Sequence, residues 1–160
     1  MFKASCIIAS DKGCCGERKD ACLPLMKEML GKDYIIVDSC ICPDDREILA
    51  NKMREYCKSS DLILTSGGTG FSERDVTPEA TLDVIERRAD GITQAMMYGS
   101  LQITQRAMLS RAVAGICGKT LIINLPGSPK AVKENLEYIL PVIGHGLEVL
   151  LGKVSDCATK

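Results

Sequence analysis

The segment Leu62–Arg87, with the sequence LILTSGGTGFSERDVTPEATLDVIER, contains a turn that suits a phosphate-bearing ligand. An apolar run ends at Ser66, and three glycines follow within four residues: Gly67, Gly68 and Gly70. Because glycine has no side chain, a ligand can approach the main chain of such a turn closely. We therefore expect a strand that passes through a bare-backbone turn at a binding site.

The residues after the glycines add a helix start and an acid. Thr77 is predicted to cap the helix and Pro78 to occupy its first position. The N–H groups of a helix start favour anions. Asp75 in the same turn would repel an anion unless a divalent cation lay between the two charges. The segment therefore predicts a phosphate site with Mg²⁺.

Cysteine is abundant, whereas histidine occurs once, at His145. The number of cysteines is odd and the N-terminus does not resemble a signal peptide, so reduced thiols are expected. A thiol-rich metal site remains an alternative, although no C-x₂-C spacing occurs. The other interpretation is that cysteine serves as a small buried apolar residue. The cysteines are Cys6, Cys14, Cys15, Cys22, Cys40, Cys42, Cys57, Cys117 and Cys157.

Composition excludes several classes of protein. A chain of 160 residues favours a single domain spanning 1–160, and 46% hydrophobic residues suffice for a sizeable core. A net charge of −1 and the absence of Trp argue against nucleic-acid binding. No apolar run approaches the ~20 residues of a membrane span. We expect a soluble, cytoplasmic protein without a membrane partner.

The apolar patterns predict strands that alternate with helices. Helices are expected over Glu17–Leu30, from a turn at Cys42–Asp45 to Tyr56, over Pro78–Ala89, over Ile92–Ile103, and from Pro126–Pro129 through Leu140, with Pro141 starting or kinking a last one that reaches Leu151. Strands are expected over Lys3–Ala9, Tyr34–Val37 and Leu62–Thr65, and a hairpin over Ala112–Cys117 and Thr120–Leu125.

This order predicts an α/β fold, with helices on both faces of a mostly parallel sheet and a small antiparallel hairpin. Ligands of such sheets bind beyond the carboxyl ends of the strands. The loops rich in Gly, Asp or Ser all follow predicted strands, so we expect them to gather at one edge and form a single active site. These loops are Ser10–Gly16, Cys42–Asp45, Ser66–Asp75 and Pro126–Pro129.

Three other patterns do not decide a function. Gly118-Lys119-Thr120 resembles the end of a Walker A loop, but the first glycine of that motif is missing and a strand follows. Asp44 and Asp45 could form a pair of functional carboxylates, or both could cap a helix, because the helix dipole favours acids at its start. The pair Ser110-Arg111 fits either a solvated loop or a phosphate site.

Three segments resemble the MogA/MoaB family: GGTGFSERDVTPEAT, AMLSRAVAGI and TLIINLPGSPKAV. The resemblance implies a three-layer α/β/α domain that is commonly a homotrimer and sometimes a hexamer. It also implies transfer of AMP from Mg²⁺-bound ATP to the terminal phosphate of molybdopterin, with release of pyrophosphate, in molybdenum cofactor biosynthesis. A molybdenum insertase would use the product. The alternative is a non-catalytic MoaB-type protein that only binds molybdopterin.

The resemblance also implies the roles of individual residues. Asp44 and Asp75 correspond to the metal-linked acids, and Ser110 would act with them in catalysis. One departure concerns the segment after Asp20, where Ala21-Cys22-Leu23 replaces the x-Ser-Gly that family members often carry. The implied contacts to pterin and nucleotide are Ser10, Asp11, Gly67, Gly68, Thr69, Gly70, Ser110, Asn124, Pro126 and Gly127.

Overall fold

A computed structural model describes residues 1–154, so Cys157 lies outside the described residues. One six-stranded sheet has the order β2-β1-β3-β6-β5-β4. β1 pairs in parallel with β2 and β3, and β3 pairs in parallel with β6. β5 runs antiparallel to both β6 and β4. The strands are β1 (Phe2–Ala9), β2 (Tyr34–Cys42), β3 (Leu62–Ser66), β4 (Arg87–Arg88), β5 (Ala114–Cys117) and β6 (Thr120–Leu125).

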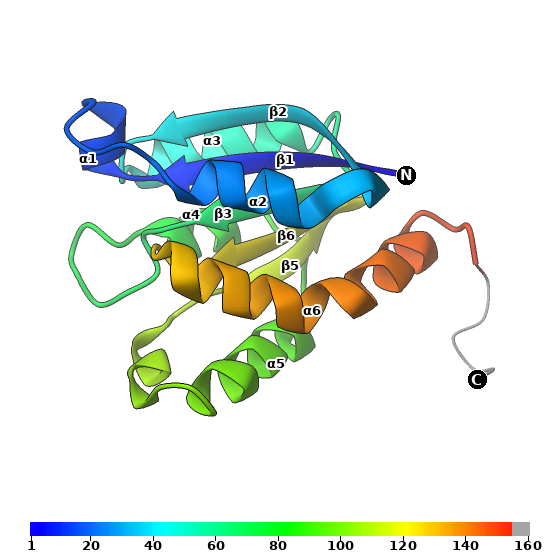
Figure 1. The fold of residues 1–160 in the computed structure, drawn as a ribbon. Coiled ribbons are helices and arrows are strands. Elements are labelled where there is room, and N and C mark those ends of the chain that lie inside the picture. Colours follow the sequence, from blue (N-terminus) through cyan, green and yellow to red (C-terminus); the bar gives the residue numbers. More distant parts are fainter. Residues whose placement is uncertain (155–160) are drawn as a thin grey trace.

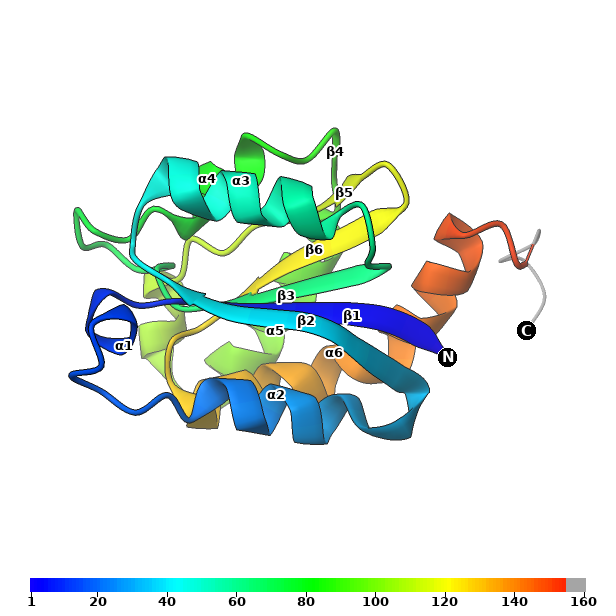
Figure 2. The ribbon, with the colours of Figure 1, turned by 90° about the horizontal axis from the view of Figure 1, so that it is seen from above.

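Helices cover both faces of this sheet, as Figures 1 and 2 show. α2, α5 and α6 lie on one face, and α3 and α4 lie on the other. The predicted three-layer α/β/α fold is therefore confirmed. Within residues 1–154, no helix is long and apolar enough to cross a membrane. The helices are α1 (Asp11–Cys14), α2 (Cys22–Leu30), α3 (Arg46–Tyr56), α4 (Thr77–Leu82), α5 (Asp90–Leu101) and α6 (Pro129–Leu150), with 3₁₀ turns η1 (Gly31–Asp33) and η2 (Gln105–Leu109).

The central strand β3 shows why two cores form. All five of its residues are buried. Because successive side chains of a strand point to opposite faces, Leu62 and Leu64 enter the core beneath α2 and α6. Ile63 enters the core beneath α3 and α4, together with Ile122 of β6. Such continuous apolar runs are typical of parallel strands that are covered on both faces.

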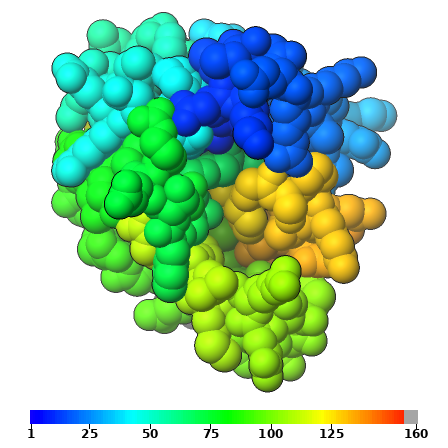
Figure 3. All heavy atoms as spheres, turned by 90° about the vertical axis from the view of Figure 1, so that its left-hand side faces the viewer, coloured from blue at the N-terminus to red at the C-terminus, as the bar shows by residue number. Residues whose placement is uncertain are grey.

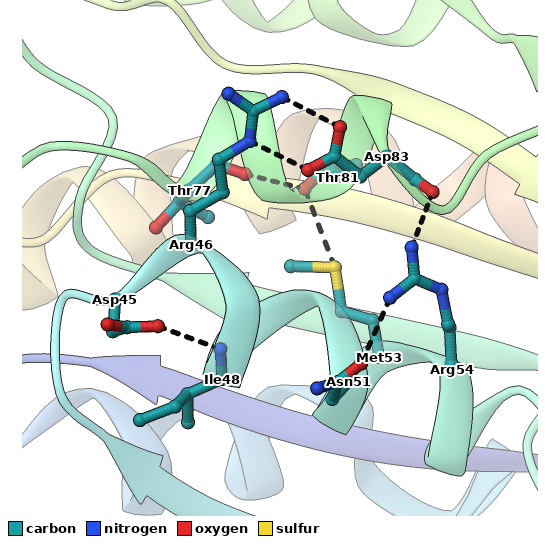
Figure 4. Close-up of polar contacts among 9 residues, drawn as sticks. All are labelled: Asp45, Arg46, Ile48, Asn51, Met53, Arg54, Thr77, Thr81 and Asp83. Carbon is teal, nitrogen blue, oxygen red and sulfur yellow. Dashed lines mark hydrogen bonds and ion pairs between the residues drawn. The ribbon is translucent and has the colours of Figure 1, made fainter.

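Polar contacts hold α3 against α4, as Figure 4 shows. The guanidinium of Arg46 donates to both carboxylate oxygens of Asp83, at 2.7 and 2.8 Å. Arg54 donates to the main-chain oxygen of Asp83 at 2.9 Å. Below these exposed pairs, the Thr81 hydroxyl contacts the Met53 sulfur at 3.6 Å. α4 is thereby held in place, and with it the end of the loop Ser66–Asp75, which we call the glycine-rich turn.

The predicted helix over Pro78–Ala89 is wrong in length, because α4 ends at Leu82. The chain then turns to the edge of β5, where Glu86 N–H donates to the Ile116 oxygen and Ala89 N–H donates to the Ala114 oxygen, each at 2.8 Å. These two bonds frame the short strand β4. A pairing partner far away in the chain thus overrides the local helical pattern.

Other elements also differ from prediction: α5 and β5 by about two residues at their ends, and the following four more clearly. α2 begins at Cys22 because the Asp20 carboxylate accepts from the N–H groups of Cys22 and Leu23. The predicted loop Ser10–Gly16 contains α1, which the Ser10 hydroxyl caps. β2 continues to Cys42, since it pairs with β1 up to that residue, with one irregularity at Val37. Pro141 lies inside one continuous helix, α6, which bends along its length (Figure 1).

Asn124 lies inside the core, although a ligand contact was predicted for it. Its side chain is fully buried. Its amide nitrogen donates to the hydroxyls of Thr65, at 3.0 Å, and Thr81, at 2.8 Å. Its amide oxygen accepts from the N–H of Val113 at 3.0 Å. The side chain therefore joins β3, β6, α4 and the segment before β5, and this geometry gives no support to a direct ligand contact.

We expect Asn124→Ala to lower the free energy of unfolding by about 2–4 kcal/mol, because it leaves the buried Val113 N–H without a partner. Urea denaturation at constant slope measures this change. Asn51→Ala on the exposed face of α3 is the control, with an expected change within about 0.5 kcal/mol. If Asn124→Ala is as stable as the control, the structural role is wrong.

Candidate functional site

The candidate site lies at the edge of the sheet where the four parallel strands end. Ser10 follows β1, Asp44 follows β2, Gly67 follows β3 and Pro126 follows β6. Figure 3 faces this edge and shows a hollow between the N-terminal segment in blue, the glycine-rich turn in green and the start of α6 in orange. The loops that the sequence predicted to gather here therefore meet in space.

The glycine-rich turn has a backbone that side chains would disrupt. Gly67 and Gly68 have positive φ angles of 94° and 66°. A β-carbon on Gly68 would lie 2.3 Å from the Thr77 hydroxyl oxygen and 3.1 Å from Oδ1 of Asp44. The turn is closed by Thr77 N–H, which donates to the Gly68 oxygen at 3.1 Å. Glycine at position 68 thus lets the main chain lie directly against two polar side chains.

Arg111 holds the turn from the inside. Its Nε donates to the main-chain oxygen of Gly70 at 2.7 Å, and its Nη2 donates to the main-chain oxygen of Asp75 at 2.6 Å. Its remaining nitrogen pairs with Glu79 of α4, and its main-chain N–H donates to the Thr69 oxygen at 2.8 Å. From the sequence alone, Arg111 fits either a solvated loop or a phosphate site. Its donors are directed at the turn, so it supports the site without facing a ligand.

Two acids join the loops after β1 and β2. The N–H of Asp11 donates to the Asp44 carboxylate and the N–H of Asp44 donates to the Asp11 carboxylate, each at 3.0 Å. Arg74 of the glycine-rich turn then grips Asp11 with two hydrogen bonds, at 2.9 and 3.0 Å. These bonds lower the pKa of the Asp11 carboxyl, with Arg74 as the largest cause. Three loops are thereby fixed together.

Asp44 combines burial with an unsatisfied oxygen. Its Oδ1 is buried without a hydrogen-bond partner, and so is the hydroxyl of Thr77. Burial raises the pKa of the Asp44 carboxyl, and the nearby charges of Asp11 and Asp75 raise it further. The neighbouring Asp45 is different, since it caps α3 by accepting from Ile48 N–H at 2.9 Å. The structure thus separates the two acids: Asp45 caps a helix and Asp44 faces the site.

These acids are suited to a magnesium ion that arrives with a phosphate ligand. Magnesium is usually bound by one or two carboxylates together with substrate phosphates. Asp44 offers an unpartnered carboxylate oxygen beside the charge of Asp75. No group of three or more His, Cys, Asp or Glu in residues 1–154 could hold a metal by itself. The fit is therefore to a shared metal rather than to a cage made of protein alone.

Two cavities open at this edge and share Gly68, Asp75 and Gly127. The larger, of about 930 Å³, reaches over α5 and has a mostly apolar wall that includes Met96 and Leu101. The smaller, of about 430 Å³, lies between the acids and basic residues such as Lys12, Arg18 and Arg74. The contrast between the walls suits an apolar ring on one side and charged groups on the other.

The remaining predicted site residues are also accounted for. Ser10 Oγ accepts from Gly13 N–H at 2.9 Å and lines the smaller cavity. Thr69 and Ser110 line the larger cavity. The main-chain oxygen of Pro126 accepts a hydrogen bond from the Ser66 hydroxyl at 2.8 Å, and that of Gly127 accepts one from the Cys22 thiol at 3.4 Å. Cys22, which differs from the residue that family members often carry there, therefore still contacts the site.

Sequence reasoning missed three side chains. Thr77 was predicted as the helix cap, but the cap position is Val76 and the Thr77 hydroxyl is unpartnered beside Gly68. Arg74 was not predicted to grip Asp11, and Arg111 was not assigned. Their place inside the segments RDVTP and LSR gave no signal of which partner each would contact.

Comparison with known proteins identifies similar sequences and structures. A family model described as "Probable molybdopterin binding domain" matches residues 5–145. Gephyrin from Dictyostelium discoideum is 45% identical over 132 residues, which cover 80% of this chain but 18% of that protein. A molybdopterin adenylyltransferase from Helicobacter pylori J99 is 37% identical over 150 residues, covering 90% of this chain and 85% of that enzyme.

A solved structure agrees with these sequence matches. The molybdopterin biosynthesis enzyme MoaB from Thermus thermophilus superimposes with a TM-score of 0.90 at 41% identity. The match covers 95% of this chain and 98% of that one. The six-stranded sheet and its flanking helices are therefore arranged as in that enzyme.

We expect Arg111→Lys to loosen the glycine-rich turn, because one ammonium group cannot reproduce the separate bonds to Gly70 and Asp75. Hydrogen exchange of the amides between residues 68 and 76 should become at least about 10-fold faster, as expected for a loss of about 1.4 kcal/mol. Arg88→Lys, which alters an exposed pair with Asp90, is the control. Equal exchange in both variants would show that the turn holds itself.

Proposed function

We propose, from the premise that this chain belongs to the family of probable molybdopterin-binding domains, that it adenylylates molybdopterin. AMP is transferred from ATP to the terminal phosphate of molybdopterin, and pyrophosphate is released. The observation that carries the proposal is the meeting of two cavities at Gly68, Asp75 and Gly127. Relatives named molybdopterin adenylyltransferase support it, among them the enzyme from Helicobacter pylori.

The two cavities suggest how the substrates are divided. The basic residues of the smaller cavity, Lys12, Arg18 and Arg74, suit phosphate oxygens. The apolar wall of the larger cavity suits a planar heterocycle. The phosphates then lie beside Gly68, where the two cavities meet. The N–H of Gly67 is occupied by the Leu125 oxygen, so the amides of residues 68–70 are the proposed donors.

The chemical step needs positioning more than proton transfer. An ionised oxygen of the molybdopterin phosphate attacks the α-phosphorus of ATP, a new P–O bond forms, and the bond to the pyrophosphate oxygen breaks. The nucleophile carries no proton at neutral pH, so no general base is required. The barrier lies in bringing anions together and in the charge that develops on pyrophosphate. Rigid loops and fixed donors at the edge of the sheet meet both needs.

Asp44 and Asp75 would hold the Mg²⁺ of Mg²⁺-bound ATP. The ion supplies charge that offsets the phosphates and orients them. Asp44 is kept in place by the N–H of Asp11, and Asp75 Oδ2 accepts from Ser72 N–H at 3.0 Å. The Ser110 hydroxyl, which accepts from Ala112 N–H at 3.3 Å, faces the larger cavity and can donate to a phosphate or pterin oxygen.

We further propose that the chain assembles as a homotrimer, with a hexamer as the alternative. A molybdenum insertase would use the product. Exposed apolar side chains on and beside α5 support contacts between copies: Tyr98, Ile103, Met108 and Leu109 are 51–63% exposed. The mass of the assembly in solution, measured by light scattering, tests this part, and a monomer contradicts it.

The activity is tested by incubating the purified chain with molybdopterin, ATP and Mg²⁺. We expect release of one pyrophosphate for each adenylylated molybdopterin, with the product identified by mass spectrometry. Omission of molybdopterin should abolish pyrophosphate release, which distinguishes the transfer from simple ATP hydrolysis. Tight binding of molybdopterin without any product would instead establish a binding protein.

We expect Asp44→Asn to lower turnover by about 100-fold, because the amide keeps the bond to Asp11 N–H but loses the charge that holds the metal. Asp45→Asn, which keeps its cap on α3, should retain turnover. Initial rates over a range of Mg²⁺ concentrations measure both. Equal dependence of the two variants on Mg²⁺ would refute the metal role.

The same variant has an expected effect on stability. Burial raises the pKa of Asp44, so the folded chain binds its proton more tightly than the unfolded chain does. The contribution of this group to stability therefore falls as pH rises through that pKa. Asp44→Asn removes the dependence, so without Mg²⁺ the variant should be at least as stable as the wild type at about pH 7. Denaturant unfolding at several pH values measures this, and a large loss of stability would contradict it.

A further inference from the structure

Two cysteines on β2 lie in direct contact. Cys40 and Cys42 are two residues apart in an extended strand, so their side chains point to the same face of the sheet. Their Sγ atoms are 3.5 Å apart. β2 is the edge strand of the sheet, and Cys40 is half-buried whereas Cys42 is 5% exposed. One thiol of the pair is thus accessible and the other is enclosed behind it.

We propose that Cys40 and Cys42 form a reversible dithiol–disulfide couple that exchanges with small disulfides such as glutathione disulfide. A rise of about 3.3 Å per residue places the two α-carbons about 6.6 Å apart, within the range of up to about 6.8 Å for disulfides. The sulfur atoms must approach by about 1.5 Å to reach a bond of about 2.05 Å. Closing the bond requires side-chain rotation together with a local adjustment of the edge strand, because the β-carbons of a disulfide lie only about 3.5–4.5 Å apart.

The surroundings make Cys40 the first nucleophile. The pKa of the Cys40 thiol is lowered to about 7: the contact with Cys42 is the largest cause, Tyr56 and the charge of Lys52 act in the same direction, and burial opposes them. Asp38 acts in the opposite direction. Both helpers come from α3, which packs over this face of the sheet. A thiolate at neutral pH is the form that attacks a disulfide.

The exchange balances in two steps. The Cys40 thiolate attacks one sulfur of glutathione disulfide, so a mixed disulfide forms and glutathione thiolate leaves. The Cys42 thiol then passes its proton to the departed glutathione thiolate, and the Cys42 thiolate attacks the Cys40 sulfur and displaces the second glutathione as a thiolate. Two cysteine thiols are oxidised to one disulfide, and one glutathione disulfide is reduced to two glutathione molecules. Excess reduced glutathione reverses both steps.

The other cysteines within residues 1–154 lack this combination of contact, access and acidity. Burial raises the pKa of the Cys6 and Cys57 thiols to about 12, and burial also raises that of Cys22. Cys14 and Cys15 are exposed on and beside α1. A metal site is not an alternative for the pair in residues 1–154, where no group of three suitable ligands occurs. The pair is therefore suited to exchange with another thiol.

The sequence allows a direct test by mass spectrometry. Trypsin cleavage after Lys32 and Arg46 releases a peptide, 33–46, whose only cysteines are Cys40 and Cys42. The folded wild-type chain is equilibrated with increasing ratios of oxidised to reduced glutathione, and free thiols are then alkylated before digestion. We expect oxidation to leave this peptide without alkyl groups and two hydrogens lighter than its dithiol form. Dithiothreitol should restore both thiols.

Matched controls identify each thiol. Cys42→Ser should retain one glutathione on Cys40, because the second step is blocked, whereas Cys40→Ser should leave the peptide without an adduct. Peptide 13–18, which contains exposed Cys14 and Cys15, reports general oxidation in the same digest. The proposal is overturned if peptide 33–46 of the wild type keeps both thiols, or carries only glutathione adducts, at ratios that already modify peptide 13–18.

Discussion

A turn that begins with three glycines in four residues has few side chains to hold its shape there, and the guanidinium of Arg111 supplies support from a distant part of the chain. It binds the main-chain oxygens of Gly70 and Asp75 and pairs with Glu79. The conformation of Gly68, which only glycine adopts readily, therefore does not depend on the turn alone. Because Gly68 and Asp75 line both cavities, this one side chain supports the turn at which the two cavities meet.

The acids of the site show how function opposes stability. Asp11 and Asp44 are joined by exchanged hydrogen bonds, yet their carboxylates bring like charges together. Arg74 offsets the charge of Asp11, while Oδ1 of Asp44 stays buried without a partner. Such an arrangement is unfavourable in the free protein and becomes favourable when a cation is shared. Groups of this kind are therefore found where a ligand completes the site.

Local patterns in the sequence predict the parallel sheet and the edge where its loops meet, but they do not predict pairing over long distances. Arg87 and Arg88 become a strand only because β5 offers an edge. Asn124 shows the same limit for side chains, since an amide at the end of a strand fits either a ligand or a core. Its partners are Thr65 of β3 and Thr81 of α4. Neither is close to it in sequence, so this buried network emerges only when the elements are packed.

The chemistry proposed for the site agrees with what the chain offers as proton donors and acceptors. The only histidine, His145, is exposed on α6 and lines neither cavity. A reaction that required a general base at neutral pH would need another titrating group at the junction. Attack by a phosphate oxygen requires none, because the nucleophile is already ionised. The residues at the junction need only hold charges in place: Asp44 and Asp75 would do so through the proposed metal, and Arg111 supports the turn that contains Asp75.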